Sequence, residues 1–306
     1  MKGYRVLFFI FFISLFSEVL TGQNFSLSGG DLRDIQKSED TLATLARGIL
    51  VSEIAENRLY ACHQFIPTLV RALKINHSFE YKFPRLENIS IQYPTDSSFR
   101  IFTWQLLVSF GEYRYFGAIQ FNQASLKLIP LVDRSDMMAD ATTLSTPADK
   151  WYGVVYYAIK PITLSNKDKA YVLFGYDGFS ANEHRKIIDV LTFKEGQAVF
   201  GLPIFRLDKG NNKSRVIYQY GADAGIRVNY DENEGMIVCD HLMPNPGASV
   251  ENARILVPDG SYEGFKFEKG FWKYIPEVFP SGNAANQRAY TTKPSKNEAK
   301  KPSKSD

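Results

Sequence analysis

Residues 102–115 are Phe102-Thr-Trp-Gln-Leu-Leu-Val-Ser-Phe-Gly-Glu-Tyr-Arg-Tyr115, and this stretch decides the fold class. Apolar side chains occupy every second position from Phe102 to Phe110, and the pattern resumes after Gly111 at Tyr113 and Tyr115. Alternation with a period of two is typical of a β-strand with one buried face. A glycine between two such runs is typical of a hairpin turn. The stretch therefore predicts two antiparallel strands joined by a tight turn.

Similar runs continue to residue 279 and predict a β domain over residues 86–279. The further strands are expected at Leu126–Val132, Trp151–Ile162, Tyr171–Tyr176, Lys186–Phe193, Ala198–Phe205, Val216–Ala222, Ile226–Tyr230, Met236–Leu242, Ser261–Phe267 and Phe271–Ile275. Turn-forming residues separate them, as in Asp231-Glu-Asn-Glu-Gly235, and no helical pattern lies between. The prediction is a mainly β fold, an antiparallel meander of about a dozen strands. Several strands are apolar on both faces, which fits a sandwich or a propeller-like closure.

A helical segment is expected before the β domain, over residues 31–85. Apolar residues recur there three or four positions apart, as in Leu42, Leu45 and Ile49. Ser38 is a candidate start, and Pro67 must kink the second half or mark its restart. The pattern predicts a helical hairpin with its break near residues 51–56.

The N-terminus has the pattern of a secretory signal peptide. Lys2 and Arg5 precede an apolar run over residues 6–16, which is shorter than the roughly 20 residues that a membrane-spanning helix needs. Cleavage between Gly22 and Gln23 is expected, and an uncleaved membrane anchor is the alternative. Residues 1–22 are the predicted signal peptide, and residues 23–30 are a polar leader that need not be ordered. The mature protein is therefore expected outside the cytoplasm and not to span the membrane.

The C-terminal residues 280–306 form a predicted disordered basic tail. They are rich in Lys, Ser, Pro and Asn and have almost no large apolar side chain to bury. The tail has six basic and two acidic residues, a net charge of +4, which exceeds the formal net charge of +3 of the whole chain. The predicted fold itself has no basic face of the kind that binds nucleic acid.

The two cysteines, Cys62 and Cys239, both belong to the exported part. In an oxidising compartment they are a possible disulfide that would join a helix to a strand. The alternative is that both are small buried apolar residues.

Six segments resemble an uncharacterised family of exported proteins from Bacteroidetes-type bacteria. They are Phe99-Arg-Ile-Phe-Thr-Trp-Gln105, Tyr113-Arg-Tyr-Phe-Gly-Ala-Ile-Gln120, Asp149-Lys-Trp-Tyr-Gly153, Arg185-Lys-Ile-Ile-Asp-Val-Leu-Thr-Phe193, Asp240-His-Leu-Met-Pro244 and Pro258-Asp-Gly-Ser-Tyr-Glu-Gly-Phe265. The resemblance covers most of residues 59–279 and leaves out the basic tail. It implies a location in the periplasm or cell envelope of a Gram-negative bacterium, and it implies no activity.

No strong catalytic motif is present, and four residues are weak nominees for catalysis: His184, Asp240, His241 and Asp259. On a strand, Asp240 points away from the face of its neighbour His241, so it cannot orient that imidazole. The dipeptide Asp177-Gly178 and the pair Asp133 and Asp136 have the spacing of ordinary turns. Four histidines without convergent spacing give no metal site, and no cofactor motif is found.

The sequence favours an exported, envelope-associated protein with a binding or structural role, and an enzyme is less favoured. The sequence identifies no partner; an envelope component or a glycan is the kind considered. The 17 Tyr, 23 Phe and 3 Trp could form a glycan-binding face, although aromatic residues in β proteins more often form the core. The alternative is an extracytoplasmic hydrolase whose Asp and His residues meet only in three dimensions. A pocket lined by carboxylates of perturbed pKa or by a histidine would favour the hydrolase, and an exposed aromatic strip would favour binding.

Overall fold

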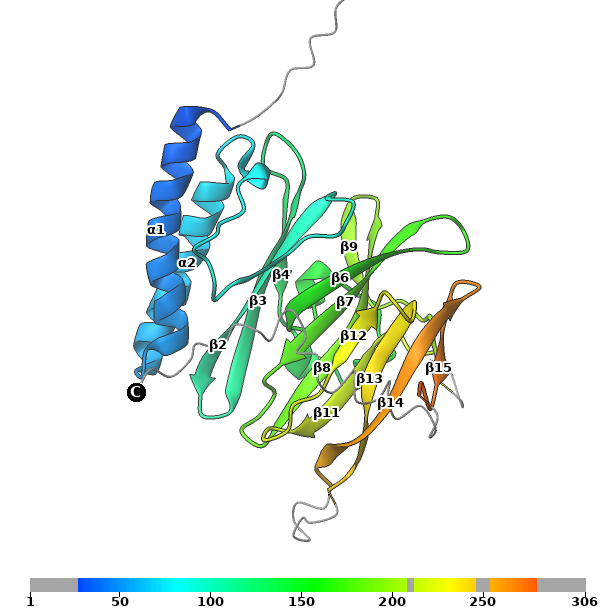
Figure 1. Ribbon diagram of the computed structural model, residues 1–306. Coiled ribbons are helices and arrows are strands. Elements are labelled where there is room, and N and C mark those ends of the chain that lie inside the picture. The colour runs from blue at the N-terminus through cyan, green and yellow to red at the C-terminus, as the bar shows by residue number, and fades with distance from the viewer. Residues whose placement is uncertain (1–26, 208–211, 246–253, 280–306) are drawn as a thin grey trace, which may run out of the picture.

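The computed structural model describes residues 27–207, 212–245 and 254–279. Within them the chain is mainly β, with two helices at the N-terminal end followed by three sheets (Figure 1), and no sheet closes into a barrel. The predicted signal peptide, the first residues of the leader and the basic tail lie outside the described residues. No helix of the described part is apolar enough over a sufficient length to cross a bilayer.

The predicted helical hairpin is confirmed as α1 (Gly29–Val51) and α2 (Ala55–Leu73). The Oγ of Ser28 accepts a hydrogen bond from the backbone N of Asp31 at 3.1 Å and caps α1. Ser38 lies inside this helix, so the expectation that it starts one was wrong. Pro67 lies within α2 and marks no restart.

The first sheet has the strand order β1-β2-β3-β4. Its strands are β1 (Ser90–Gln92), β2 (Phe99–Ser109), β3 (Glu112–Phe121) and β4 (Leu128–Val132). The alternation in β2 confirms the predicted hairpin: Phe102 and Trp104 point toward the helices, while Phe99 and Ile101 point the other way. Phe110 is the exception, because it lies in the turn and is 94% exposed.

The second sheet has the order β5-β9-β8-β7-β6, with β11 paired to β8 beyond β9. Its strands are β5 (Thr146–Pro147), β6 (Val155–Thr163), β7 (Lys169–Asp177), β8 (Glu183–Lys194), β9 (Gln197–Phe200) and β11 (Val216–Gly221). Most of β7 and residues 187–192 of β8 are buried on both faces, in agreement with the mostly apolar sequence of these segments.

The third sheet has the order β10-β15-β14-β13-β12. Its strands are β10 (Phe205–Arg206), β12 (Val228–Asp231), β13 (Met236–Pro244), β14 (Leu256–Glu268) and β15 (Phe271–Ile275). All its pairings are antiparallel except β10 with β15. The single strand expected over 198–205 is divided between β9 and β10, because the chain leaves the second sheet and joins the third.

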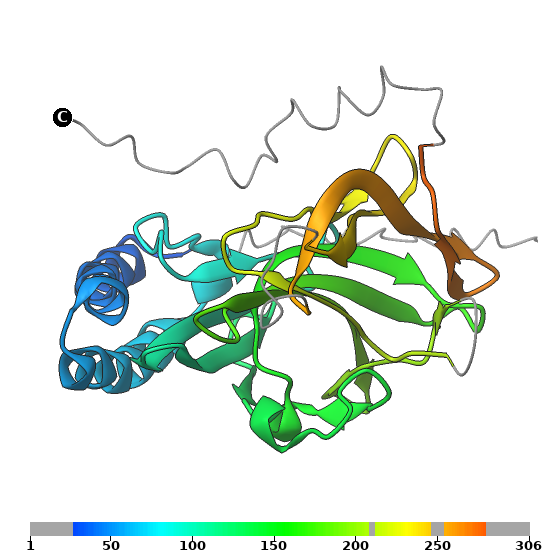
Figure 2. The ribbon, with the colours of Figure 1, turned by 90° about the horizontal axis from the view of Figure 1, so that it is seen from below.

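Layers of buried side chains join these parts in succession. One layer fills the space between the helices and the first sheet, a second lies between the first and second sheets, and a third lies between the second and third sheets. Figure 2 shows the helices at one end of the molecule and the orange strands of the third sheet away from them. The arrangement is that of a sandwich with an additional sheet. Short 3-10 turns at Ser78–Glu80, Ser135–Met137 and Ala148–Lys150 complete the described elements.

Candidate functional site

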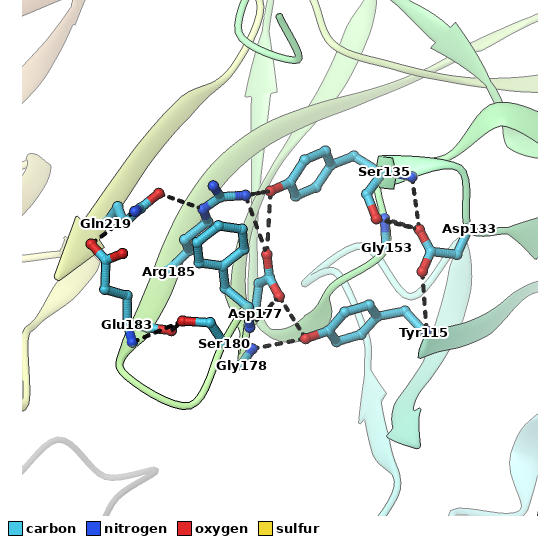
Figure 3. Close-up of polar contacts among 12 residues, drawn as sticks. Tyr115, Asp133, Ser135, Gly153, Asp177, Gly178, Ser180, Glu183, Arg185 and Gln219 are labelled. Atoms are coloured by element: carbon cyan, nitrogen blue, oxygen red, sulfur yellow. Dashed lines mark hydrogen bonds and ion pairs between the residues drawn. The ribbon is translucent and has the colours of Figure 1, made fainter. Parts of the chain in front are cut away.

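A dense polar cluster lies at the edge of the layer between the first and second sheets (Figure 3). We define the Asp177 cluster as Tyr115, Tyr152, Asp177 and Arg185. Tyr115 comes from β3, and Asp177 ends β7 directly opposite Arg185 on β8. Tyr152 follows the Ala148–Lys150 turn. Residues far apart in the sequence are therefore brought together by the pairing of the strands.

The carboxylate of Asp177 is held by protein groups on both oxygens. Its Oδ1 accepts hydrogen bonds from the hydroxyl of Tyr115 at 2.7 Å and from the backbone N of Phe179 at 2.8 Å. Its Oδ2 accepts one from the hydroxyl of Tyr152 at 3.3 Å. Burial raises the pKa of Asp177, although these hydrogen bonds oppose the rise. Burial and the neighbouring carboxylate also raise the pKa of Tyr152, to about 12.

The guanidinium of Arg185 is fixed on three sides. Its Nε donates to Oε1 of Gln219 at 2.9 Å, and its Nη1 donates to the hydroxyl of Tyr152 at 3.0 Å. Its Cζ lies 3.2 Å from the ring centroid of Phe179, which is a stacking contact. The side chain is still 22% exposed, and its Nη2 has no hydrogen-bond or ion-pair partner among the described residues. An oriented cationic edge is therefore left for a ligand.

The turn that carries Phe179 is set by its local sequence. Phe179 has a φ of 44°, and the backbone N of Glu183 donates to Oγ of Ser180 at 3.0 Å across the turn. Before it, a Cβ on Gly178 would lie 2.8 Å from the ring of Tyr113. Glycine is needed there because the backbone passes so close to that ring.

Asp133 fixes the backbone at Tyr115 and at Gly153, the residue after Tyr152. Its Oδ2 accepts a hydrogen bond from the backbone N of Tyr115 at 3.1 Å, and its Oδ1 accepts one from the backbone N of Gly153 at 3.2 Å. A Cβ on Gly153 would lie 2.4 Å from Cγ of Asp133. The carboxylate thus ties β3 to the segment that carries Tyr152.

A second buried pair lies deeper in the same layer. Nε of Arg215 lies 2.9 Å from Oδ2 of Asp189, and both side chains are at most 1% exposed. The Nη1 of Arg215 donates to the backbone O of Ala141 at 2.6 Å. Because solvent reaches neither group, this pair has the character of an internal cross-link.

Two of the four catalytic nominees meet. On β13 and β14, Nδ1 of His241 lies 2.8 Å from Oδ2 of Asp259, with side chains 38% and 24% exposed. The hydroxyl of Ser261 donates to the other carboxylate oxygen at 2.7 Å, so it does not approach the imidazole as a nucleophile would. Burial tends to raise the pKa of Asp259, but the hydrogen bonds from Ser261 and His241 outweigh it and hold the pKa below its ordinary value.

The other two nominees have different neighbours. Asp240 accepts a hydrogen bond from the backbone N of Arg227. His184, on β8, lies between the rings of Tyr176 and Tyr220, with centroids 5.4 and 6.1 Å away. Burial lowers its pKa. The predicted set of four therefore does not form one site.

Cys62 and Cys239 are both free and buried, in different layers. The possible disulfide between them is therefore not formed, since one cysteine packs between the helices and the first sheet and the other between the second and third sheets. Burial raises the pKa of both thiols, which keeps them in the poorly nucleophilic thiol form. Within the described residues, no three His, Cys, Asp or Glu side chains gather as a metal site would require.

Two surface features would separate a hydrolase from a binding protein: a pocket lined by a histidine or by carboxylates of perturbed pKa, and an exposed strip of aromatic side chains. The hollows and aromatic side chains described below give little support to either. Three hollows of about 340–600 Å³ are lined by Glu87 or Glu268 and by no histidine or aspartate. All three tryptophans are buried, and the aromatic side chains most exposed in the described part are the scattered Tyr60, Phe110 and Phe179.

The sequence did not predict Asp177, Tyr115 and Arg185 as site residues. The spacing of Asp177-Gly178 predicts an ordinary turn, whereas Asp177 is the last residue of β7 and its carboxylate is the centre of the buried cluster. The available signal was an acidic residue at the end of an apolar run, residues 170–176, where a buried charge needs partners.

Comparison with known proteins gives no relative: no protein-family model, no curated protein and no solved structure matches this chain.

Proposed function

We propose that this protein is an exported, envelope-associated binding protein that holds an anionic ligand at the free edge of Arg185 and does not turn it over. The observation that carries the proposal is the guanidinium of Arg185, which is fixed by Phe179, Gln219 and Tyr152 yet leaves its Nη2 edge unpaired. Preorganised arginines of this kind bind carboxylates well, because little side-chain entropy is lost on binding.

The binding role is favoured over catalysis by the state of the nearby carboxylate. Asp177 is 5% exposed, and three hydrogen bonds occupy its two oxygens. A general acid or base must reach the proton that it transfers, and this carboxylate is directed at the protein instead. Its role in the proposal is to orient Tyr152 and thereby Arg185.

The binding step is tested by calorimetric titration with D-glucuronate, a sugar that carries one carboxylate, with uncharged D-glucose as the ligand control. Arg185→Gln should abolish measurable glucuronate binding. Lys186→Gln removes the same charge from the adjacent residue on the opposite face of β8 and should leave binding intact. Equal binding by the wild type and Arg185→Gln would contradict the proposal.

The export step rests on the signal-peptide pattern and on the family resemblance, which together suggest the periplasm or envelope of a Gram-negative cell. Mass spectrometry of the protein from its native host should find an N-terminus at Gln23. Recovery of the chain with Met1 intact would contradict cleavage.

The hydrolase remains a second candidate because of one observation, the 2.8 Å contact between His241 and Asp259. An exposed imidazole oriented by a carboxylate can act as a general base on water. Under the binding proposal, a folded His241→Gln protein keeps whatever activity the wild type has. Loss of a measurable turnover by about 10²–10⁴ in that variant, with an unchanged melting curve, would favour the hydrolase.

A further inference from the structure

Three cations stand side by side across adjacent strands of the third sheet. Arg206 on β10 is paired with Lys273 on β15, and Lys273 is paired with Lys266 on β14. Directly opposite residues lie on the same face, and neighbouring strands are about 4.8 Å apart. We call these three residues the cation row.

The cation row faces away from the core. The alternate residues on the same strands, Phe205, Trp272 and Phe267, are packed in the layer between the second and third sheets. All three members of the row are exposed. Their charges are therefore offered to solvent on one face of the sheet.

Within the described residues, no carboxylate forms an ion pair with the cation row. None of its three members makes an ion pair or a side-chain hydrogen bond within the described residues, and the guanidinium of Arg206 only stacks on Phe271, with Cζ 3.4 Å from the ring centroid. Like charges placed directly opposite each other on a sheet repel. A row of this kind destabilises the free protein slightly and gains stability when an anion lies across it.

A hollow of about 430 Å³ lies beside the row and adds to its positive character. It is lined by Arg206, Lys273, Lys269, Phe271, Tyr274 and a single acidic residue, Glu268. Two members of the row thus also line a concavity with aromatic walls, of a size that admits a small ligand rather than a flat surface alone.

We infer that the cation row and its hollow bind an acidic oligosaccharide that carries carboxylates on successive sugar units. Several anionic groups are needed to span three cations, and the concavity with aromatic walls suits sugar rings. A bilayer surface suits it less well, because Leu207 is the one exposed large apolar side chain among the described residues that line the hollow. The most exposed apolar side chains of the described part, Phe110 and Met137, lie elsewhere in the fold and are not available to insert beside the row. This site is separate from Arg185 and does not depend on the function proposed above.

The test is calorimetric titration with trigalacturonate at low ionic strength, with uncharged maltotriose as the ligand control. Lys273→Gln removes the central cation of the row. It should weaken trigalacturonate binding about tenfold or more, because the middle carboxylate of the ligand then has no cation opposite it. Lys37→Gln, an exposed lysine on α1, should change nothing. All of these titrations are made in an Arg185→Gln background, so that carboxylate binding at the first site does not contribute to the signal. Binding should weaken with added salt, since the charges are exposed.

Melting curves without ligand test the repulsion within the cation row, whichever sugar binds to it. Lys273→Gln should melt at the same temperature as the wild type or about 1–2 °C higher at low salt, because it relieves repulsion. A lower melting temperature, or equal trigalacturonate binding by the two proteins, would overturn the inference. Binding of inorganic tripolyphosphate or of phosphatidylglycerol vesicles in the absence of trigalacturonate binding would overturn the choice of an acidic saccharide.

Discussion

Two arginines contact Tyr152 from different depths of the same layer. Arg185 donates to the hydroxyl of Tyr152 at 3.0 Å and is 22% exposed, whereas Arg215 lies 5.3 Å from the centre of its ring and is fully buried. Arg215 has a carboxylate partner at 2.9 Å, while the acidic neighbour of Arg185 is 3.9 Å away. The two arginines therefore have different roles. The buried charge of Arg215 needs a partner inside the protein, whereas the partly exposed charge of Arg185 can bind a partner from solution.

The largest effect is expected at the deeper arginine. Arg215→Met leaves the carboxylate of Asp189 buried without its partner and should lower the free energy of unfolding by about 3–5 kcal/mol in urea denaturation. Replacing both residues, as Asp189→Leu with Arg215→Met, should recover much of the loss, since no unpaired charge then remains. A loss below about 1 kcal/mol for Arg215→Met would contradict the structural role of the pair.

The next largest loss of stability is expected at Gly153, which follows Tyr152 in the chain. Gly153→Ala puts a Cβ 2.4 Å from Cγ of Asp133 and should cost about 1–3 kcal/mol by overpacking. Gly225→Ala is the matched control, because its added Cβ meets nothing within 4 Å, and it should stay within about 0.5 kcal/mol of the wild type. Equal unfolding free energies for the two variants would show that Asp133 moves aside freely.

The shallower arginine should matter little for stability. Arg185→Gln removes hydrogen bonds to Gln219 and Tyr152 at the edge of the core and should cost about 1 kcal/mol in urea denaturation. Its main effect should be the loss of glucuronate binding. A cost as large as that of Arg215→Met would remove the distinction between the two arginines.

The smallest expected effect is a dependence of folding stability on pH that comes from the raised pKa of Asp177. Since burial raises the pKa of Asp177 above 3.8, the folded protein holds this proton after the unfolded chain has lost it. Stability therefore falls as pH rises from the unfolded pKa through the folded pKa, and it is constant above that range. The stability of the wild type relative to Asp177→Asn should decline over this window in melting curves. A relative stability that increases with pH would mean that the pKa of Asp177 is lowered instead.

The sequence predicted the elements better than it predicted the site. The period of two in β2 and the spacing of three or four in α2 reflect local packing, and both features are in the structure. The start of α1 was missed because Ser38 resembles a cap when the packing around it is unknown, while Ser28 is the residue that caps the helix.

The candidate site depends on register, which alternation alone does not fix. Asp177 meets Tyr115 across 62 residues of sequence, and it lies opposite Arg185 only through the pairing of β7 with β8. His241 and Asp259 meet in the same way, through an irregularity in the pairing of β13 with β14. The cation row likewise becomes visible only when three strands are aligned.

The central claim is that Arg185 faces a ligand and Arg215 faces the protein. Nuclear magnetic resonance of ¹⁵N-labelled protein tests it most directly, by following the Nε–Hε signals of the two arginines as D-glucuronate is added, with assignments from Arg185→Gln and Arg215→Met. The signal of Arg185 should shift progressively and saturate, while that of Arg215 stays in place. A stationary Arg185 signal, or equal shifts of both signals, would contradict the claim.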